Sequence, residues 1–141
     1  MGTCDAALWI YLPADENCSE FIKEVAVGLQ GHKASIEDIQ WSPTQNHVLA
    51  SCSVDQTVKL WDLRATQLKP QISFVAHDCD VNVISWNSTS KFLLASGDDK
   101  GEFRIWDLRM LKSASSNQNS KNTEFDSITR IRWHSDAITS L

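Results

Sequence analysis

The chain lacks any apolar run long enough to cross a membrane, and it lacks a charged and then apolar leader at its start. A membrane-spanning helix needs roughly 18 or more consecutive apolar residues, and an export signal needs a basic segment followed by an apolar one. We therefore expect a soluble intracellular protein with no membrane contact. Helical periodicity is absent as well, so we expect strands rather than helices.

Closely paired cysteines are also missing. No Cys-x-x-Cys sequence occurs, and the four cysteines are widely spaced: Cys4, Cys18, Cys52 and Cys79. Without an export signal, free thiols are the natural state of such cysteines. His77 and Cys79 bring two possible metal ligands together, but a zinc site needs about four. The sequence therefore predicts no metal site and no cofactor.

An excess of basic residues is the third absence. The chain has 13 lysines and arginines against 18 aspartates and glutamates, and its formal net charge is −5. A general nucleic-acid binder usually carries a clustered basic face. We therefore expect no direct nucleic-acid binding, and the negative charge favours a basic protein partner.

What the sequence does contain is a repeat with a period of 45 residues and no gap. A repeat of about 40–45 residues with histidine near its start and Trp-Asp at its end is typical of one four-stranded blade of a β-propeller. The sequence thus predicts an all-β fold of WD-repeat blades, which serve as a binding scaffold. His32, Trp41, Ala50-Ser51 and Trp61-Asp62-Leu63-Arg64 recur as His77, Trp86, Ala95-Ser96 and Trp106-Asp107-Leu108-Arg109.

The repeat divides the chain into four parts. Residues 31–75 and 76–126 are predicted to be two complete WD repeats, the second with a polar surface loop at 113–123. Residues 1–30 would hold the end of a preceding blade and its outer strand, with Leu8-Trp9 at the close of a repeat. Residues 127–141, with Ile128 to Trp133 as an opening strand, would start a further, truncated blade. Because a propeller closes with typically 4–8 blades, we expect an incomplete propeller.

Short strands separated by polar turns are expected within each repeat. In the first unit the expected strands cover 36–41, 48–53, 58–61 and 72–75. In the second unit they cover 81–86, 92–96 and 103–106, and an outermost strand is expected close to Thr123–Asp126.

Four residues of the first unit have the order and spacing of a hydrogen-bonded set found in WD repeats: His32, Ser51, Asp55 and Trp61. Serine, histidine and aspartate together also raise the question of hydrolysis. The indole N–H, however, is only a donor, so the set is better interpreted as a buried network in which each polar group satisfies another. We therefore predict a structural role and no enzymatic activity.

The second unit matches this set less closely. His77, Ser96 and Trp106 correspond to members of the first set, but Lys100 stands where Asp55 would be. Either the turn is shifted so that Asp99 still reaches His77, or this blade lacks a complete set. We place Asp99 in the predicted network. Asp98 and Asp99 belong to a turn sequence, which is a more common role than that of a calcium ligand.

Trp-Asp-x-Arg occurs twice and ends in Arg64 and Arg109. A guanidinium group after a strand end forms forked hydrogen bonds with a carboxylate, within its own propeller or on a partner. By this motif some WD-repeat proteins resemble substrate receptors of cullin-type ubiquitin ligases. We weigh the structural role of the motif above docking, and keep both arginines as candidate partner-binding residues.

Several longer stretches resemble the glutamate-rich WD-repeat protein family, a group of ribosome-biogenesis factors. They are Gly31-His32, Ser35 to Thr44, Ala50 to Ser53, Ala76 to Trp86 and the Trp-Asp-Leu-Arg endings. The resemblance covers about Gly31 to Arg109, and it extends to the related histone-binding WD-repeat chaperones. The family's long acidic N-terminal region and about half of its blades have no counterpart in this chain.

The resemblance implies an assembly role in the nucleus and nucleolus, in which the protein chaperones a basic ribosomal protein and associates with pre-ribosomes. A histone client and a ligase adaptor are the alternative partners. Exposed acids on a rigid rim would neutralise and steer a basic client. Four acids near the starts of first strands are the candidate client contacts: Glu37, Asp38, Asp78 and Asp80. The alternative interpretation of these acids is a solvated rim.

Overall fold

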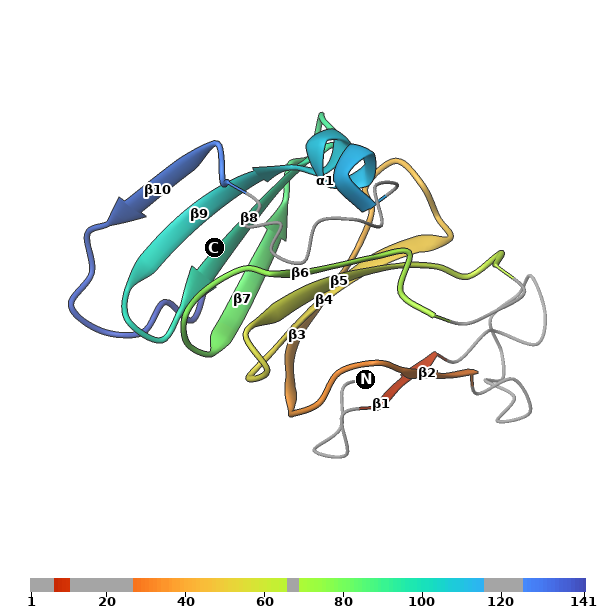
Figure 1. Ribbon diagram of the computed structural model, residues 1–141, viewed down its shortest axis with the longest axis horizontal. Coiled ribbons are helices and arrows are strands. Elements are labelled where there is room, and N and C mark those ends of the chain that lie inside the picture. Colours follow the sequence, from red (N-terminus) through yellow and green to blue (C-terminus); the bar gives the residue numbers. More distant parts are fainter. Residues whose placement is uncertain (1–6, 11–26, 66–68, 116–125) are drawn as a thin grey trace, which may run out of the picture.

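The computed structural model describes residues 7–10, 27–65, 69–115 and 126–141. Within these ranges the strands form two four-stranded antiparallel sheets and one two-stranded sheet. The two larger sheets lie side by side, and the two-stranded sheet lies below the first of them in Figure 1. The prediction of an all-β fold made of propeller blades is confirmed.

The first blade consists of β3 (Ile36–Trp41), β4 (Val48–Ser53), β5 (Thr57–Asp62) and β6 (Ile72–Val75). These strands follow one another in the sheet in chain order, and each pairs antiparallel with the next. The four ranges agree with those expected from the alternation of apolar and polar residues. A short polar turn at 54–56 joins β4 to β5, where Gln56 adopts a positive φ of 69°.

The second blade consists of β7 (Val81–Trp86), β8 (Leu93–Asp98), β9 (Glu102–Asp107) and β10 (Thr129–Arg132). β10 is its outer strand, since it pairs antiparallel with β9 and places Ile131 opposite Phe103. The prediction that Ile128 to Trp133 is the opening strand of a further blade is therefore wrong, and so is the prediction that the outer strand lies close to Thr123–Asp126. Residues 123–125 lie outside the described ranges, and Asp126 belongs to no strand.

The misassignment of β10 has a clear cause in the sequence. Trp133 resembles Trp41 and Trp86, which end the first strands of their blades, so Ile128–Trp133 looked like another first strand. The histidines give the correct register instead. His134 comes three residues after Ile131, just as His77 comes three residues after Phe74 on β6. The next repeat therefore begins at His134, after an insertion between β9 and β10.

The two-stranded sheet pairs β1 (Ala7–Ile10) with β2 (Val27–Gln30). Leu8 faces Leu29 across this pair as Val58 faces Phe74 across β5 and β6, and Leu29 comes three residues before His32. By this register β1 and β2 hold the third and fourth positions of a preceding blade. In this register, Leu8-Trp9 lies two positions earlier in β1 than Leu60-Trp61 lies in β5. The two Leu-Trp pairs are therefore not equivalent, which the comparison of sequences did not predict.

A short helix, α1 (Leu108–Ser115), follows β9 at the upper edge in Figure 1. No helix was predicted here, and its end overlaps the polar stretch 113–123, most of which lies outside the described residues. Asp107 accepts a hydrogen bond from the N–H of Arg109 at 2.9 Å and so caps the first turn. Leu108 and Leu111, three residues apart on one side of the helix, are buried in the core between the blades.

The main core fills the space between the two blades. Apolar residues of β4, β5 and β6 meet residues of β7, β8 and β9 and the start of α1. The rings of Phe74 and Trp106 pack at 4.9 Å between centroids, tilted by 59°. A second core joins β1 and β2 to the other face of the first blade, with Leu8, Leu29 and Trp61 each 1% exposed. The first blade is thus covered on both faces.

Two side chains of β3 hold β7 in place. The carboxylate of Asp38 accepts a hydrogen bond from the N–H of Ile84 at 3.0 Å, and the amide oxygen of Gln40 accepts one from the N–H of Trp86 at 2.9 Å. These bonds satisfy backbone donors on the inner edge of β7, which no neighbouring strand pairs among the described residues. Val83 and Ser85 occupy the equivalent positions of the second blade, so the pattern does not repeat.

We expect Asp38→Ala to lower the free energy of unfolding by about 1–3 kcal/mol, because it leaves the N–H of Ile84 without its acceptor. Asp38→Asn, which keeps an acceptor oxygen, should lose less. The control is Glu37→Ala, an exposed neighbour whose removal should cost less than about 0.5 kcal/mol. Urea unfolding followed by circular dichroism measures all three, and equal losses for Asp38→Ala and Glu37→Ala would contradict the assignment.

Candidate functional site

The four predicted residues of the first blade form a continuous hydrogen-bonded chain. Nδ1 of His32 lies 3.0 Å from the carboxylate of Asp55, and its Nε2 lies 2.7 Å from the hydroxyl of Ser51. The same hydroxyl accepts a hydrogen bond from the indole N–H of Trp61 at 2.9 Å. A histidine protonated on Nδ1 satisfies every contact, because Nδ1 then donates to the carboxylate and Nε2 accepts from Ser51.

The carboxylate of Asp55 organises the turn around His32. It accepts hydrogen bonds from the N–H of Lys33 at 2.8 Å, from the N–H of Thr57 at 3.0 Å and from the Thr57 hydroxyl. Burial alone would raise the pKa of Asp55, but these hydrogen bonds and His32 outweigh it and lower the pKa to about 2. Burial lowers the pKa of His32, against the opposing effect of Asp55. The pair therefore joins a neutral imidazole to an ionised carboxylate at neutral pH.

This network offers no route to nucleophilic catalysis. A catalytic hydroxyl must meet a substrate, whereas Ser51 is 0% exposed and its oxygen is occupied by His32 and Trp61. The arrangement instead ties the loop before the first blade to the second and third strands of that blade. Its chemistry is that of a buried polar network in which each donor has an acceptor.

The second blade builds the same network with a different acid. Nδ1 of His77 lies 2.9 Å from the carboxylate of Asp98, and Ser96 again joins the histidine at 2.7 Å to the indole of Trp106 at 2.9 Å. The prediction that Asp99 reaches His77 is wrong. Asp99 is exposed, and its carboxylate accepts a hydrogen bond from the side chain of Asn82 at 3.4 Å.

The acid has moved from the turn to the end of a strand. Asp98 is the last residue of β8 and stands two residues after Ser96, at the position that Ser53 occupies in the first blade. From there its second oxygen accepts hydrogen bonds from the N–H groups of Lys100 and Glu102, at 2.9 and 2.8 Å. Asp98 thus closes the turn of the second blade as Asp55 closes the turn of the first. The second blade therefore needs no acid at position 100, where Lys100 replaces Asp55.

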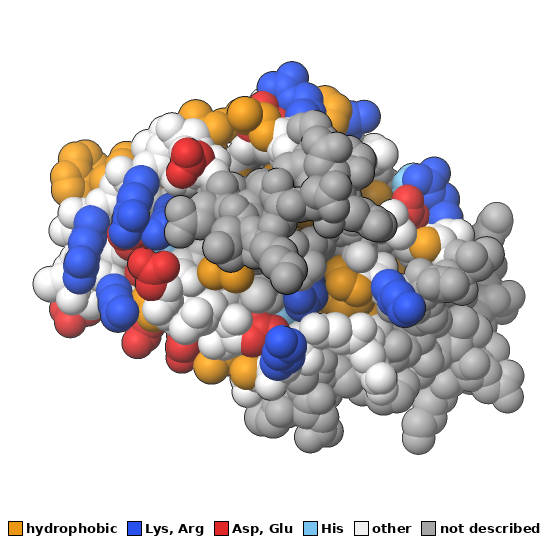
Figure 2. All heavy atoms as spheres, viewed as in Figure 1, with side chains coloured by type: hydrophobic (Ala, Val, Ile, Leu, Met, Phe, Trp, Pro, Cys, Tyr) orange, Lys and Arg blue, Asp and Glu red, His pale blue; other side chains and the backbone are white. Residues whose placement is uncertain are grey.

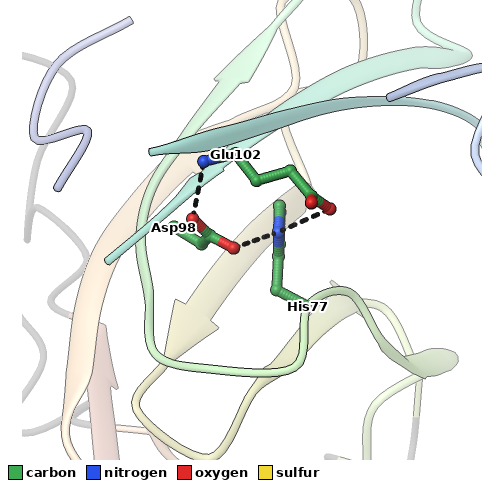
Figure 3. A group of neighbouring side chains, drawn as sticks. All are labelled: His77, Asp98 and Glu102. Atoms are coloured by element: carbon green, nitrogen blue, oxygen red, sulfur yellow. Dashed lines mark hydrogen bonds and ion pairs between the residues drawn. The ribbon is translucent and has the colours of Figure 1, made fainter. Parts of the chain in front are cut away.

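Glu102 joins this second network, which sequence reasoning did not predict. As Figure 3 shows, its carboxylate reaches toward the imidazole of His77 beside Asp98, and it lies 4.0 Å from Nδ1. It is also paired with Arg104 at 2.5 Å and with Arg130 of β10 at 2.8 Å. Glu102 replaces Thr57 and Arg104 replaces Lys59 at the 45-residue spacing, so the acid and the base of this ion pair were visible in the repeat.

His77, Asp98 and Glu102 place three potential ligand atoms within 4.8 Å of one another. Their lone pairs are already in use, since Asp98 accepts hydrogen bonds from His77 and from two backbone N–H groups, and Glu102 neutralises two arginines. A divalent cation there would meet the positive charges of Arg104 and Arg130 at close range. The donor set therefore fits an ion-pair network rather than a metal centre. Cys79 contributes a hydrogen bond to Asp98 and burial raises its pKa, so it remains a thiol.

The candidate client contacts separate into two groups. Glu37 and Asp78 are exposed and Asp80 is partly buried, whereas Asp38 is used internally to hold Ile84. β3 and β7 both begin at the lower edge in Figure 1, which brings the first three acids to the same side of the protein. Figure 2 shows acidic side chains along the lower left edge, with lysine and arginine side chains beside them.

Glu37 owes its exposure to a β-bulge at the start of β3, between Ile36 and Asp38. Asn82 occupies the equivalent bulge of β7 and holds the side chain of Asp99 on the same edge. Asp99, predicted as a network residue, is therefore a surface acid of this edge instead. We call Glu37, Asp78, Asp80 and Asp99 the acidic edge.

The two candidate arginines lie at the opposite edge, after the ends of β5 and β9. Each guanidinium group forms a forked pair with the aspartate two residues before it: Arg64 with Asp62, and Arg109 with Asp107. Both side chains remain over 60% exposed. Arg64 also borders a hollow of about 440 Å³ between the blades, whose lining includes Trp86 and Phe92.

Comparison with known proteins agrees with this geometry. Residues 22–62 and 68–107 match the family described as WD domain, G-beta repeat. The chain belongs to the WD40 repeat family. WD40 propellers are generally non-catalytic scaffolds for protein–protein interaction, and the two matched stretches end at Asp62 and Asp107, the aspartates paired with the arginines. Among the described residues, no helix has the length and apolar character needed to cross a membrane.

Curated relatives of this WD40 chain are similar over its repeats. The glutamate-rich WD repeat-containing protein 1 of Dictyostelium discoideum is 43% identical over 73 residues, 51% of this chain and 14% of the relative. The protein HEAT STRESS TOLERANT DWD 1 of Arabidopsis thaliana is 39% identical over 73 residues, 52% of this chain and 14% of the relative. The ribosome assembly protein rrb1 of Schizosaccharomyces pombe is 44% identical over 46 residues, 33% of this chain and 10% of the relative.

A solved structure supports the fold independently. A chain of the mitotic checkpoint complex superposes with a TM-score of 0.71 at 21% identity, covering 98% of this chain and 34% of the solved one. Likeness at this identity concerns the fold alone. The chain therefore matches only a small part of the length of its curated relatives and about a third of its structural neighbour.

The exchanged acid of the second blade is testable with adjacent residues. We expect Asp98→Asn to lower the free energy of unfolding by about 1–3 kcal/mol, because it weakens the bond to His77 in a buried network. Asp99→Asn, one residue away and exposed, should change it by less than about 0.5 kcal/mol. Urea unfolding of both variants decides the assignment, and a larger loss for Asp99→Asn would reverse it.

Both networks should make stability depend on pH. Burial lowers the pKa values of His32 and His77 in the folded protein, so the unfolded chain binds protons first as the pH falls below the ordinary histidine value of 6.5. The folded-state pKa values of Asp55 and Asp98 are also lowered, which removes further stability below about pH 4. Melting temperatures measured from pH 8 to pH 4 should therefore decline below about pH 6.5. The control is His134→Gln, which replaces an exposed histidine outside both networks and should leave that decline unchanged.

Proposed function

We propose that this chain forms part of a WD-repeat scaffold that chaperones a basic ribosomal protein during ribosome assembly in the nucleus. The observation that carries the proposal is the acidic edge, where Glu37 at the start of β3, Asp78 in the loop before β7 and Asp99 in the turn after β8 are exposed. Two relatives support the setting: one is named a glutamate-rich WD repeat protein, and one is named a ribosome assembly protein. Nucleolar residence and association with pre-ribosomes follow from the same proposal.

The physical basis of client binding would be neutralisation of positive charge. Glu37 lies in β3, and Asp78 and Asp80 lie in the short loop that leads into β7, so the acids are brought together by the stacking of two neighbouring blades. Asp99 extends this edge along the second blade. Such an array raises the association rate of a lysine- and arginine-rich segment and weakens in salt. Asp38 is excluded from this role because both its oxygens accept backbone hydrogen bonds.

Charge reversal at the edge tests the proposal. We expect Asp78→Lys to weaken the binding of basic large-subunit ribosomal proteins roughly 3- to 10-fold. This corresponds to a loss of about 1 kcal/mol of binding free energy. Asp126→Lys makes the same change of net charge at an exposed residue outside the acidic edge and should bind like the wild type. Affinities are measured by titration calorimetry at low and physiological salt.

The same titration separates the clients. Binding to a panel of basic large-subunit ribosomal proteins in preference to a core-histone tail peptide supports the ribosomal client. Preference for the histone peptide would instead favour the related chaperone function. Absence of binding to either class, or equal losses in Asp78→Lys and Asp126→Lys, would refute a client site on the acidic edge.

A second candidate is docking to the adaptor of a cullin-type ubiquitin ligase through Arg64 and Arg109. The repeated forked geometry at one edge favours it, as does the match to a relative whose name contains DWD. Both arginines are over 60% exposed, so their replacement should spare the fold. Adaptor binding that is unchanged in the double variant Arg64→Ala, Arg109→Ala would remove this candidate.

A further inference from the structure

A hollow of about 440 Å³ lies between the two four-stranded blades. One wall includes Leu60 of β5 and Ile72 of β6, and the other includes Trp86 at the end of β7 and Leu108 at the start of α1. α1 lies at the upper edge in Figure 1, whereas the acidic edge lies at the lower one. The hollow is thus formed by two complete blades, on the side opposite the acidic edge. Its volume is within the range of pockets that bind small ligands, roughly 300–1000 Å³.

The inside of the hollow is apolar. Ile72 and Leu108 are 3% and 4% exposed and belong to the core between the blades. Trp86 and Phe92 are only partly buried, so a ligand in the hollow can contact their rings. The indole N–H of Trp86 donates to the carbonyl of Lys91 at 3.0 Å, which fixes the orientation of this ring. Such aromatic walls fit an aliphatic or aromatic side chain, because burial of apolar surface stabilises the contact.

Basic side chains surround this apolar interior. Arg64 and Lys91 both line the hollow. The ammonium group of Lys91 and the guanidinium group of Arg109 lie over the ring of Phe92, at 5.1 and 5.2 Å from its centroid. The attraction of this ring for a cation is therefore already satisfied from within the chain. A cationic ligand would meet like charges there, so the site favours an anionic one.

The ion pair with Asp62 orients Arg64 at the rim of the hollow. Nε and Nη2 of Arg64 donate to the two oxygens of the Asp62 carboxylate, at 3.0 and 2.7 Å. A guanidinium group has five N–H donors, so this fork uses two of them and leaves three for a further acceptor. Hydrogen bonding to Asp62 raises the pKa of Arg64, which stays charged. The Arg64 side chain is 63% exposed, so a carboxylate from outside the chain can reach it.

The charge at this edge favours a peptide over a nucleic acid. Arg64, Lys91 and Arg109 carry three positive charges against the two negative charges of Asp62 and Asp107, which leaves one positive charge in excess. A nucleic-acid strand carries a charge on every phosphate and requires a clustered basic face. A peptide with a few carboxylates around one apolar residue matches both the small excess of charge and the apolar hollow.

We propose that this hollow and its basic rim bind an acidic peptide segment of a partner protein. One apolar side chain of the segment enters the hollow beside Trp86 and Phe92, and a neighbouring carboxylate pairs with Arg64 and Lys91. This partner is chemically opposite to the basic client of the acidic edge, and the two sites lie at opposite edges of the blades. The scaffold can therefore hold a basic and an acidic protein at the same time. Docking through the two arginines alone would not require the hollow.

Titration of the 141-residue chain with short synthetic peptides tests this proposal. The probe carries aspartates and glutamates on both sides of a central phenylalanine. We expect it to bind roughly 10-fold more tightly than the same peptide with lysines in place of the acids. A similar loss is expected when serine replaces the phenylalanine. Fluorescence anisotropy of the labelled peptides measures the affinities.

Three variants of the chain locate the contact. Arg64→Gln removes one charge of the rim and should weaken binding of the probe roughly 3- to 10-fold. Gln71→Trp places a large side chain at an exposed position of the lining while keeping every charge, and it should weaken binding by a similar factor. Lys100→Gln is the matched control, because it removes an exposed charge in the turn after β8, at the acidic edge, and should bind like the wild type. Circular dichroism melting verifies that each variant is folded.

Four results would overturn the proposal. The first is absence of saturable binding of the probe. The second is tighter binding of the lysine peptide or of a single-stranded oligonucleotide than of the probe. Equal losses in Arg64→Gln and Lys100→Gln would show that the attraction depends on net charge alone. Unchanged binding in Gln71→Trp would show that the peptide does not enter the hollow.

Discussion

The stacking of one blade on the next is the interaction on which the rest of this structure depends. A four-stranded sheet with apolar residues on both faces buries neither face by itself. In the first blade both faces are covered, one by the β1–β2 sheet and the other by the second blade. The contact of Phe74 with Trp106 belongs to the second of these interfaces. Stability and the position of the acidic edge both follow from this repeated packing.

The buried histidine networks hold the turns that this packing brings together. In each blade one histidine connects a loop, a strand hydroxyl and an indole, and one carboxylate closes the neighbouring turn. The two carboxylates come from different positions, Asp55 in a turn and Asp98 at a strand end. The network therefore requires an ionised carboxylate beside Nδ1 of the histidine. Residues at different sequence positions can supply this carboxylate. Arg104 and Arg130 add an ionic layer to the second network through Glu102.

The same geometry separates structural acids from those available to a partner. Asp38 and Glu37 are neighbours in the sequence, yet Asp38 is bound to the backbone of the next blade while Glu37 lies in an exposed bulge. Asp98 and Asp99 divide in the same way, one buried against His77 and the other on the surface. Charge alone does not distinguish the members of either pair. The direction of each side chain, set by the pleat and by the bulge, does.

The sequence by itself determined the all-β class, the seven strands of 36–62, 72–75 and 81–107, and the complete network of the first blade, because a 45-residue period and alternating apolar residues are local properties of the chain. Only the tertiary structure decided that β10 completes the second blade, that Asp98 replaces Asp99, that Asp38 bridges two blades and that a helix follows β9. Each of these depends on pairing or packing between segments far apart in the chain. An insertion before β10 and a two-residue displacement of an acid leave the local pattern almost unchanged, while the partners across the sheet select a single register.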